Sequence, residues 1–296
     1  MSRLFFALPG DERLAREVAS GCGGEVGEVN FRRYPEGDAY FRLEPVPAGR
    51  QVVLVARLVN PDPKTTSLLF MSRTARELGA TSVGLVAPYM PYLRQDRRFR
   101  PGEPVSARLY ADLLSAAFDW IVTVEPHLHR IPRLSDIFAA PAEAVSAAPL
   151  LAEWIRSHVA HPLVIGPDEE SAQWASRVAA TVGAPWATMV KRRLGDREVE
   201  IAPPDLSRHA GRTAVLVDDM VSTGRTVALA AEALRRQGFE VSICAAAHDL
   251  TSAESRRFLA GAGLQLVSTD SVRRRRGALP IAGALAEAVR RLSDGA

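Results

Sequence analysis

Cysteines, lysines and long apolar segments are all scarce in this chain of 296 residues. The two cysteines, Cys22 and Cys244, are too few for a disulfide framework, a zinc finger or an iron–sulfur site. The first residues, MSRLFFALPGDER, have only a short apolar stretch before Pro9, too short for the core of a signal peptide. No segment approaches the length of a membrane span. We therefore expect a cytoplasmic protein that does not enter a membrane.

Neither sign of charge dominates, since 37 basic and 34 acidic residues give a formal net charge of +3. This slight basic excess suits anionic small ligands but is too small to indicate a nucleic acid as partner. Almost all the basic residues are arginines, and Lys64 and Lys191 are the only lysines in the sequence. Because the chain is so biased toward arginine, a lysine that remains is a stronger indication of a functional role.

Apolar runs without polar alternation occur in both halves of the chain, which is typical of strands covered on both faces. The length suits two domains of ordinary size, and 47% hydrophobic with 24% charged residues is usual for a globular protein. The runs are 51–58, 82–90 and 120–128 in the first half, and 162–170, 186–193, 213–220, 241–249 and 264–271 in the second.

Helical patterns lie between the apolar runs. Two of them, 67–80 and 226–239, finish at Gly79 and Gly238 as helices commonly do. Strand and helix in alternation predict an α/β fold with two units, each a mostly parallel sheet flanked by helices. The Ala/Pro-rich stretch 138–149 indicates the boundary, so we expect domains at 1–143 and 144–296.

Charged side chains collect where the predicted strands end. In open α/β sheets, ligands bind outside the carboxyl ends of the strands, and anions favour the helix N-termini that follow. Solvated loops alone explain poorly why five strand ends carry such groups. The clusters are Glu125 with His127, Asp168, Lys191 with Arg193, Asp218 with Asp219, and His248 with Asp249.

The stretch AVLVDDMVSTGRTV (214–227) sets Asp218 and Asp219 between an apolar run and a tight turn. Such a pair indicates either an acidic strand end, with Asp219 as a cap and Gly224 as a plain turn, or a site for cations and hydroxyls. The stretch is similar to the PRPP (5-phosphoribosyl diphosphate) loop of type I phosphoribosyltransferases and PRPP synthetases. The resemblance implies that Asp218 and Asp219 hold the ribose hydroxyls, and that a loop cradles the 5-phosphate with its amides and hydroxyls. The loop residues are Ser222, Thr223, Gly224, Arg225 and Thr226.

Two segments of the first half resemble the ribose-phosphate diphosphokinase (PRPP synthetase) family. APYMPYLRQDRR (87–98) matches the family's ATP-binding segment at three residues in a row: Arg94, Gln95 and Asp96. FRRYPEGDAYFRLE (31–44) looks like the family's aromatic-Ser-Asp-Gly-Glu hairpin, which reaches across a subunit interface to the adenine. Its aromatic and acidic positions fall on Tyr34, Glu36 and Asp38, with the two acids exchanged in order.

The resemblance also implies metal ligands. TVEPHLHR (123–130) aligns with the family's Thr-Val-Asp-Leu-His, which makes His127 a metal and triphosphate ligand. His127 and His129 share a face of the predicted strand, but no cysteine or third histidine is spaced to complete a zinc site. VIGPDEES (164–171) matches the family's Pro-Asp-x-Gly-Gly loop at Asp168, a predicted Mg²⁺ ligand, although Glu169, Glu170 and Ser171 stand where the glycines usually lie.

The catalytic groups implied by the resemblance are basic. VKRRLGDREVEI (190–201) resembles the family's flexible loop, whose Lys191 and Arg193 would neutralise charge on the diphosphoryl group in transit. The run RRRR (273–276) is either an anion or RNA patch or, as we favour, a surface run near the C-terminus of a phosphate enzyme.

The chain is thus identified as a divergent member of the ribose-phosphate diphosphokinase family. The resemblance implies two type I phosphoribosyltransferase-like domains and a homo-oligomer that uses Mg²⁺, with ATP and ribose 5-phosphate as substrates. The alternatives are a nucleobase phosphoribosyltransferase, which would share the loop at 218–226, and a non-catalytic regulatory relative.

Overall fold

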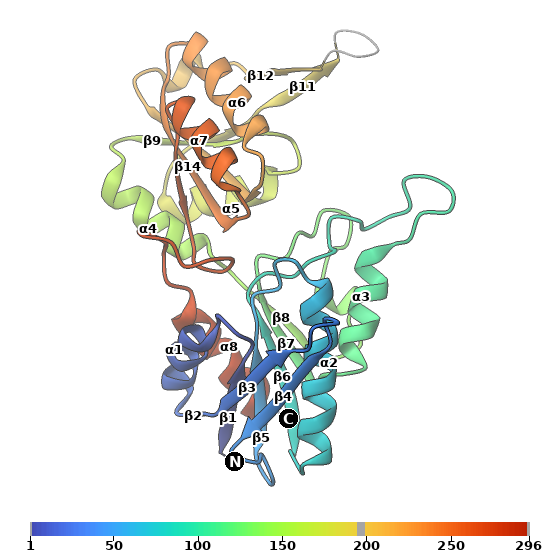
Figure 1. Ribbon diagram of the computed structural model, residues 1–296. Coiled ribbons are helices and arrows are strands. Elements are labelled where there is room, and N and C mark those ends of the chain that lie inside the picture. The colour runs from blue at the N-terminus through green and yellow to red at the C-terminus, as the bar shows by residue number, and fades with distance from the viewer. Residues whose placement is uncertain (1, 194–198, 295–296) are drawn as a thin grey trace. The chain divides into compact units, whose positions relative to one another are not determined.

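The computed structural model describes residues 2–193 and 199–294, with side chains for 2–190 and 202–294. The chain divides into two units (Figure 1). Unit 1 comprises the residues up to Val145 and those from Ala282 onward, and unit 2 runs from Ser146 to Ile281. Among the described residues, no helix is long and apolar enough to cross a membrane.

Unit 1 is built on a parallel sheet with the strand order β2-β1-β5-β6-β7-β8. Every residue of β5 and of β7 is buried, which explains why these strands read as unbroken apolar runs. Helices α1 and α8 cover one face of the sheet, and α2 lies on the other (Figure 1). The strands are β1 Arg3–Ala7, β2 Glu25–Val26, β5 Gln51–Val55, β6 Ser82–Ala87, β7 Trp120–Val124 and β8 Ala142–Val145. The helices are α1 Glu12–Cys22, α2 Asp62–Glu77, α3 Ser106–Ser115, the 3₁₀ turn η1 Leu134–Asp136 and α8 Ala282–Asp294.

An antiparallel hairpin, β3 Glu28–Arg33 and β4 Ala39–Glu44, stands apart from the hydrogen-bonded sheet of unit 1. Its tip closes with the N–H of Tyr34 donating to the carbonyl of Asp38 at 2.9 Å. The hairpin expected at 31–44 is therefore confirmed.

Helix α8 belongs to unit 1, although the sequence led us to expect 144–296 as one domain. It packs on α1 (Figure 1), close enough that a Cβ at Gly21 would lie 2.6 Å from the Cβ of Ala286. Arg3 Nε donates to Ser293 Oγ at 2.8 Å, and Gln51 donates to the carbonyl of Ser293 at 3.0 Å. The physical reason is the apolar face of α8, which lies buried against the helix and sheet of unit 1.

Unit 2 contains a second parallel sheet, with the order β10-β9-β13-β14-β15. Helices α4 and α5 contact each other, while α6 packs on β13 and β14 and α7 on β15. A separate antiparallel ribbon joins β11 to β12. The strands are β9 Pro162–Gly166, β10 Trp186–Thr188, β11 Val190–Arg193, β12 Val199–Ala202, β13 Thr213–Val221, β14 Glu240–Asp249 and β15 Gln265–Ser268. The helices are α4 Ala148–His158, α5 Ala172–Val182, the 3₁₀ turn η2 Ser207–His209, α6 Arg225–Arg236 and α7 Ala253–Gly261.

Both units thus have the expected α/β architecture, and several element ends were predicted correctly. Helices α2 and α6 are followed by Gly79 and Gly238 with φ of 89° and 86°. Two predictions were wrong in detail. The run 120–128 is a strand only to Val124, because Glu125 has a φ of 33° and its N–H bonds the carbonyl of Val145. The run 186–193 is two strands, of which β10 joins the sheet and β11 joins the ribbon.

Candidate active site

The acidic residues of unit 2 gather at the carboxyl edge of its sheet. Strand β9 leads into Asp168, and the adjacent strand β13 carries Asp218 and Asp219. Because both strands are parallel, their carboxyl ends meet at the same edge. The charges of Asp219 and Asp168 both act on Asp218, so the three acids lie close to one another.

Asp218 and Asp219 lie within β13, which continues to Val221, one residue beyond the run 213–220 expected from the sequence. Both are partly buried, and the N–H of Asp219 donates to Asp218 Oδ1 at 2.9 Å. Burial, followed by the charges of Asp219 and Asp168, raises the pKa of Asp218 well above its ordinary value. The cluster therefore favours a partner that is a cation or a donor of hydrogen bonds.

A phosphate-sized anion would find donors in the loop between β13 and α6. Gly224 is the N-cap of α6 in the left-handed conformation, with a φ of 77°. A Cβ at this position would lie 2.7 Å from the side chain of Leu259, so glycine is required here for space as well as for conformation. Because glycine offers no side chain to cap the helix, the first amides of α6 are left to other acceptors. Ser222 and Thr223 are exposed beside them, and Thr226 is partly buried.

The alternative of a plain capped turn fits this geometry poorly. Asp219 lies on the strand and is not the N-cap, and Arg225 N–H reaches Thr223 Oγ1 only at 3.4 Å. The loop at 222–226 has the open amides that the phosphate interpretation needs.

Ser171 holds the Asp168 loop in place. Its N–H donates to Asp168 Oδ1 at 3.1 Å, and its hydroxyl donates to the Asp168 carbonyl at 2.6 Å. The hydroxyl occupies the space over Gly166, where a Cβ would lie 2.5 Å from it. None of the described residues 167–171 has a positive φ, so this loop does not need the family's glycines. Glu169 and Glu170 are exposed.

Lys191 and Arg193 occupy alternate positions on β11, opposite Ile201 and Val199 of β12. Their side chains lie outside the described residues. The backbone places the predicted flexible loop on a two-stranded ribbon rather than on a strand of the sheet.

In unit 1, the loop after β6 carries the predicted residues 94–96, the loop after the adjacent strand β7 carries His127, and an ion pair joins the two loops. Arg130 Nη1 lies 3.1 Å from Asp96 Oδ1 and donates to both oxygens of this buried carboxylate. Gln95 accepts hydrogen bonds from the Ser106 hydroxyl at 2.7 Å and from the Ala107 N–H, so it fixes the start of α3. Arg94 is exposed. Of the three predicted residues, Arg94 is therefore exposed, whereas Gln95 and Asp96 hold the loop in place.

His127 and His129 follow β7 in the loop and not on a strand face, which corrects the sequence expectation. A hydrogen bond of 3.2 Å joins His127 Nδ1 to His129 Nε2, and the rings meet edge to face. Both side chains are partly buried.

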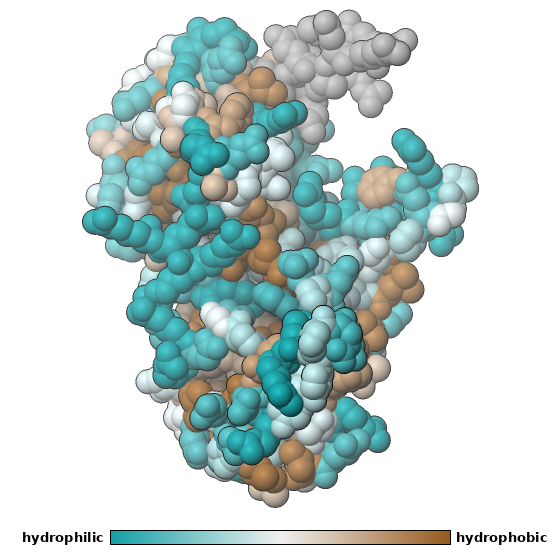
Figure 2. All heavy atoms as spheres, viewed as in Figure 1, coloured by the Kyte–Doolittle hydropathy of each residue, from teal (hydrophilic) through white to brown (hydrophobic). Residues whose placement is uncertain are grey.

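Tyr34, Glu36 and Asp38 are exposed at the tip of the β3–β4 hairpin. The guanidinium of Arg32 lies over the rings of Tyr34 and Tyr40, at 5.0 and 4.7 Å from their centres. The view in Figure 2 shows that hydrophilic side chains cover much of this face of unit 1. The tip presents an aromatic ring and two carboxylates to the surroundings.

Sequence reasoning missed two residues that hold these loops. Arg130 was not assigned, although a buried acid such as Asp96 needs a cation and Arg130 follows the histidines directly. Ser171 was noted only as a departure from glycine. Its position three residues after Asp168, just before a helix, was the available signal.

Comparisons with known proteins cover both units. Residues 4–117 match a family model described as the N-terminal domain of ribose phosphate pyrophosphokinase, and residues 134–269 match the phosphoribosyl transferase domain. The ribose-phosphate pyrophosphokinase of Methanopyrus kandleri is 39% identical over 284 residues, which are 95% of this chain and 96% of that protein. The enzyme of the same name from Methanothermobacter thermautotrophicus is 34% identical over 264 residues, with 88% and 91% covered.

A solved structure is similar over the full length. The crystal structure of phosphoribosylpyrophosphate synthetase from Mycobacterium smegmatis has a TM-score of 0.87 at 27% identity, and each chain is covered to 100%. The similarity therefore includes the first half of the chain as well as the half that carries the phosphoribosyl transferase match.

Proposed function

The chain belongs to the ribose-phosphate pyrophosphokinase family, and from this premise we propose how its residues carry out the reaction. The enzyme transfers the β,γ-diphosphoryl group of ATP to the 1-hydroxyl of ribose 5-phosphate, and the products are PRPP and AMP for nucleotide biosynthesis. The 1-hydroxyl oxygen forms a bond to the β-phosphorus and loses its proton to solvent, and the bond from that phosphorus to the oxygen shared with the α-phosphorus breaks, so that AMP leaves. The observation that carries the proposal is the acidic pair Asp218–Asp219 beside an uncapped α6.

Unit 2 binds the acceptor. The carboxylates of Asp218 and Asp219 accept hydrogen bonds from the ribose 2- and 3-hydroxyls, which orients the sugar. The 5-phosphate accepts hydrogen bonds from the amides of the first turn of α6, and its charge is favoured by the helix dipole. The hydroxyl-bearing loop residues Ser222, Thr223 and Thr226 add donors, and Gly224 and Arg225 complete the loop.

Unit 1 binds the donor. The exposed guanidinium of Arg94 pairs with phosphate oxygens, while Gln95 and Asp96 hold its loop through α3 and Arg130. His127 contacts the triphosphate. Tyr34 stacks on adenine, and Glu36 and Asp38 accept from its amine.

A divalent cation fits the acidic cluster of unit 2. Carboxylate oxygens are the ligands that Mg²⁺ prefers, and the burial that raises the pKa of Asp218 makes a compensating cation favourable. We propose Asp168 as a Mg²⁺ ligand and His127 as a further one. When bound, the cation neutralises charge on the phosphates.

Lys191 and Arg193 are the proposed catalytic residues. Their positive charges stabilise the negative charge that develops on the diphosphoryl group during transfer. The remaining rate enhancement comes from orientation of the 1-hydroxyl, because Asp218 and Asp219 hold the sugar. No general base is assigned.

The proposal includes a cytoplasmic homo-oligomer. Support comes from the exposed tip of the β3–β4 hairpin, whose Tyr34 is 40% exposed in a single chain. In a homo-oligomer, the hairpin would deliver Tyr34, Glu36 and Asp38 to the ATP of a neighbouring subunit.

The test is AMP release from ATP and ribose 5-phosphate with no nucleobase present. Steady AMP formation that requires both substrates is expected. A nucleobase phosphoribosyltransferase would release none, and neither would a non-catalytic relative, so absence of AMP from folded protein would reject the proposal. A nucleotide panel with ATP, GTP and CTP then defines the donor.

A further inference from the structure

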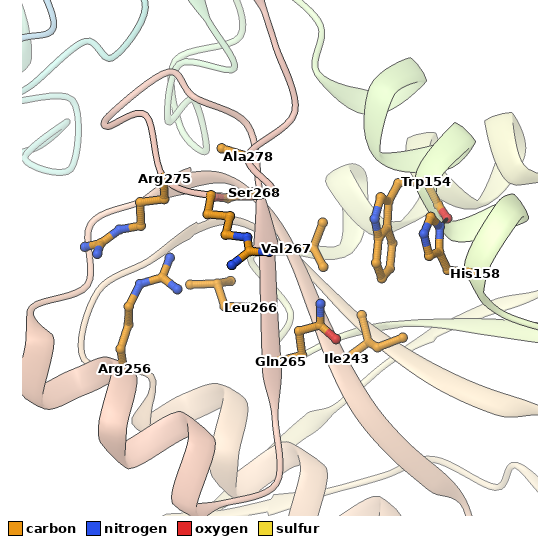
Figure 3. Close-up of a pocket in the computed structure, with 12 residues that line it drawn as sticks. Trp154, His158, Ile243, Arg256, Gln265, Leu266, Val267, Ser268, Arg275 and Ala278 are labelled. Carbon is orange, nitrogen blue, oxygen red and sulfur yellow. Dashed lines mark hydrogen bonds between the residues drawn. The ribbon is translucent and has the colours of Figure 1, made fainter.

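A cavity of about 340 Å³ lies in unit 2 along β15, the edge strand of its sheet (Figure 3). Arg256 from α7 and Arg275 lie on one side of the strand, and Trp154 and His158 from α4 lie on the other (Figure 3). This volume is within the range of small-ligand sites. None of its lining residues is among those assigned above to substrates or metal.

Positive charge is in excess around this cavity, which we call the β15 cavity. Arg256, Arg275 and Arg276 line it, and none of the twelve described lining residues is acidic. Two of these arginines contact the buried carboxylate of Asp249: Arg256 donates a hydrogen bond to it, and Arg275 Nε lies 2.9 Å from it. Burial alone would raise the pKa of Asp249, but hydrogen bonds from Thr251 and Arg256 lower it below its ordinary value, so Asp249 is charged at neutral pH. Asp249 thus pairs with two of the three guanidinium groups, and the third, Arg276, lines the cavity beside them.

Hydrogen-bond donors in and around the cavity also lack acceptors. Arg256 Nε is buried and has no hydrogen-bond partner among the described residues, which is costly for a charged donor. The edge of β15 adds a backbone donor. Leu279 N–H donates to the Ser268 carbonyl at 2.9 Å from outside the sheet, so Ser268 presents its backbone groups outward. Because strand residues alternate, Leu266 two residues earlier also presents its N–H outward, at the cavity.

The cavity also offers an aromatic surface. The rings of Trp154 and His158 stack at 4.3 Å with an angle of 7° between their planes. Excess positive charge, unpaired donors and a stacked aromatic pair are the features that recognise a phosphoryl group, alone or attached to a ring. We propose that the β15 cavity is a binding site for a phosphate-bearing ligand, separate from the loop at 222–226. This site gives a role to the arginine run at 273–276.

Arg276 is the residue to test. It is exposed, whereas removal of Arg256 or Arg275 would leave the buried Asp249 with one cation fewer. Arg273, exposed in the same run and not a lining residue, is the matched control. Because inorganic phosphate would also enter the loop at 222–226, all proteins carry Thr226→Glu, which places a carboxylate there.

Binding of labelled inorganic phosphate is measured by equilibrium dialysis on the full chain. Thr226→Glu is expected to retain phosphate, and Arg276→Ala in that background to bind about tenfold more weakly, as loss of one charge-assisted hydrogen bond predicts. Arg273→Ala in that background is expected to bind as Thr226→Glu does. Equal retention by the Arg276→Ala protein, or no retention by Thr226→Glu, overturns the proposal. Circular dichroism establishes that each variant is folded.

A second arm identifies the source of the phosphoryl group. If AMP binds more tightly than phosphate, and Trp154→Ala removes that advantage without changing phosphate binding, the ligand is a nucleotide that stacks on Trp154. If AMP and phosphate bind equally and Trp154→Ala changes neither, the ligand is free phosphate. Both results require that Arg276→Ala weakens binding, so the proposal fails without that effect.

Discussion

The fold and the proposed reaction favour different protonation states of Asp218. Burial and the charges of Asp219 and Asp168 oppose its ionisation, whereas a carboxylate that accepts ribose hydroxyls should be charged. A ligand or cation that donates to the cluster removes the conflict. The proposed binding role of Asp218 therefore comes at a cost in stability of the unliganded protein.

Asp218→Asn should stabilise the protein in the absence of metal and substrate. A carboxyl group whose pKa is raised by folding contributes stability at low pH, and this is lost as pH rises from its ordinary value of 3.8 through the raised value. With EDTA at pH 7 we expect Asp218→Asn to unfold about 2 °C or more above the wild type, and the difference to vanish toward pH 4. Differential scanning fluorimetry over this pH range measures it. A variant less stable than wild type at pH 7 would contradict the raised pKa of Asp218. The same substitution should weaken the affinity for ribose 5-phosphate about tenfold, because one hydrogen-bond acceptor for the sugar is lost.

Lys191→Ala should lower turnover about 10²-fold or more, because a charge that stabilises the transferring group is lost. Steady-state kinetics of AMP formation measure the effect. The chain offers a matched control in its other lysine, Lys64, whose Nζ donates to the Arg57 carbonyl at 2.6 Å. Lys64→Ala should leave turnover close to wild type. If the two variants had the same turnover, Lys191 would have no catalytic role.

At the scale of elements, the turn before α6 forms the proposed phosphate-binding loop. The left-handed Gly224 turns the chain from β13 into α6 and leaves the first-turn amides uncapped. Packing of Leu259 from α7 against Gly224 holds this turn in place.

Gly224→Ala should damage both stability and substrate binding. Its Cβ would be strained at a φ of 77° and would collide with Leu259, so we expect a loss of about 2 kcal/mol or more and a raised KM for ribose 5-phosphate. Gly183, after α5, is a matched control, because it has the same φ of 77° but nothing within 4 Å of an added Cβ. Gly183→Ala should cost about 1 kcal/mol and leave KM unchanged. Chemical denaturation and initial rates separate the two, and equal effects would contradict the account.

Elements with strong local signals were predictable from the sequence. The buried strands β5 and β7 read as unbroken apolar runs, the first half of β13 reads as one too, and glycines marked the ends of α2 and α6. The division of 186–193 into β10 and β11 was not predictable, because the pairing of each half depends on distant strands. The roles of Gln95 and Asp96 in holding their loop also depend on α3 and Arg130, which only the folded chain brings near.

On the scale of the whole molecule, two α/β units of similar plan carry different groups at corresponding strand ends. In unit 2, β13 carries Asp218 and Asp219. In unit 1, β5 is followed by Arg57, whose Nη1 donates to the buried Asp11 at 2.8 Å. This ion pair occupies the strand end in unit 1, which agrees with the proposal that ribose 5-phosphate binds to unit 2. Unit 2 begins at Ser146, within the Ala/Pro-rich stretch 138–149 that the composition indicates. The return of α8 to unit 1 was not predictable, since its apolar face would suit either sheet.

Leu285→Ala should destabilise unit 1 by about 2–5 kcal/mol, because this leucine of α8 is fully buried. Leu229 on α6 is 52% exposed, so Leu229→Ala should change stability by less than about 0.5 kcal/mol. Urea unfolding compares them. A neutral Leu285→Ala would mean that α8 does not contribute to the stability of unit 1.

The central claim is that an intact diphosphoryl group moves from ATP to ribose 5-phosphate. The most direct measurement incubates the protein with Mg²⁺, ribose 5-phosphate and ATP radiolabelled at the γ-phosphorus, and then separates the products chromatographically. We expect the label in PRPP, in an amount equal to the AMP formed, and loss of both products in Lys191→Ala. Label recovered as inorganic phosphate with ADP, or no product from folded protein, would contradict the account.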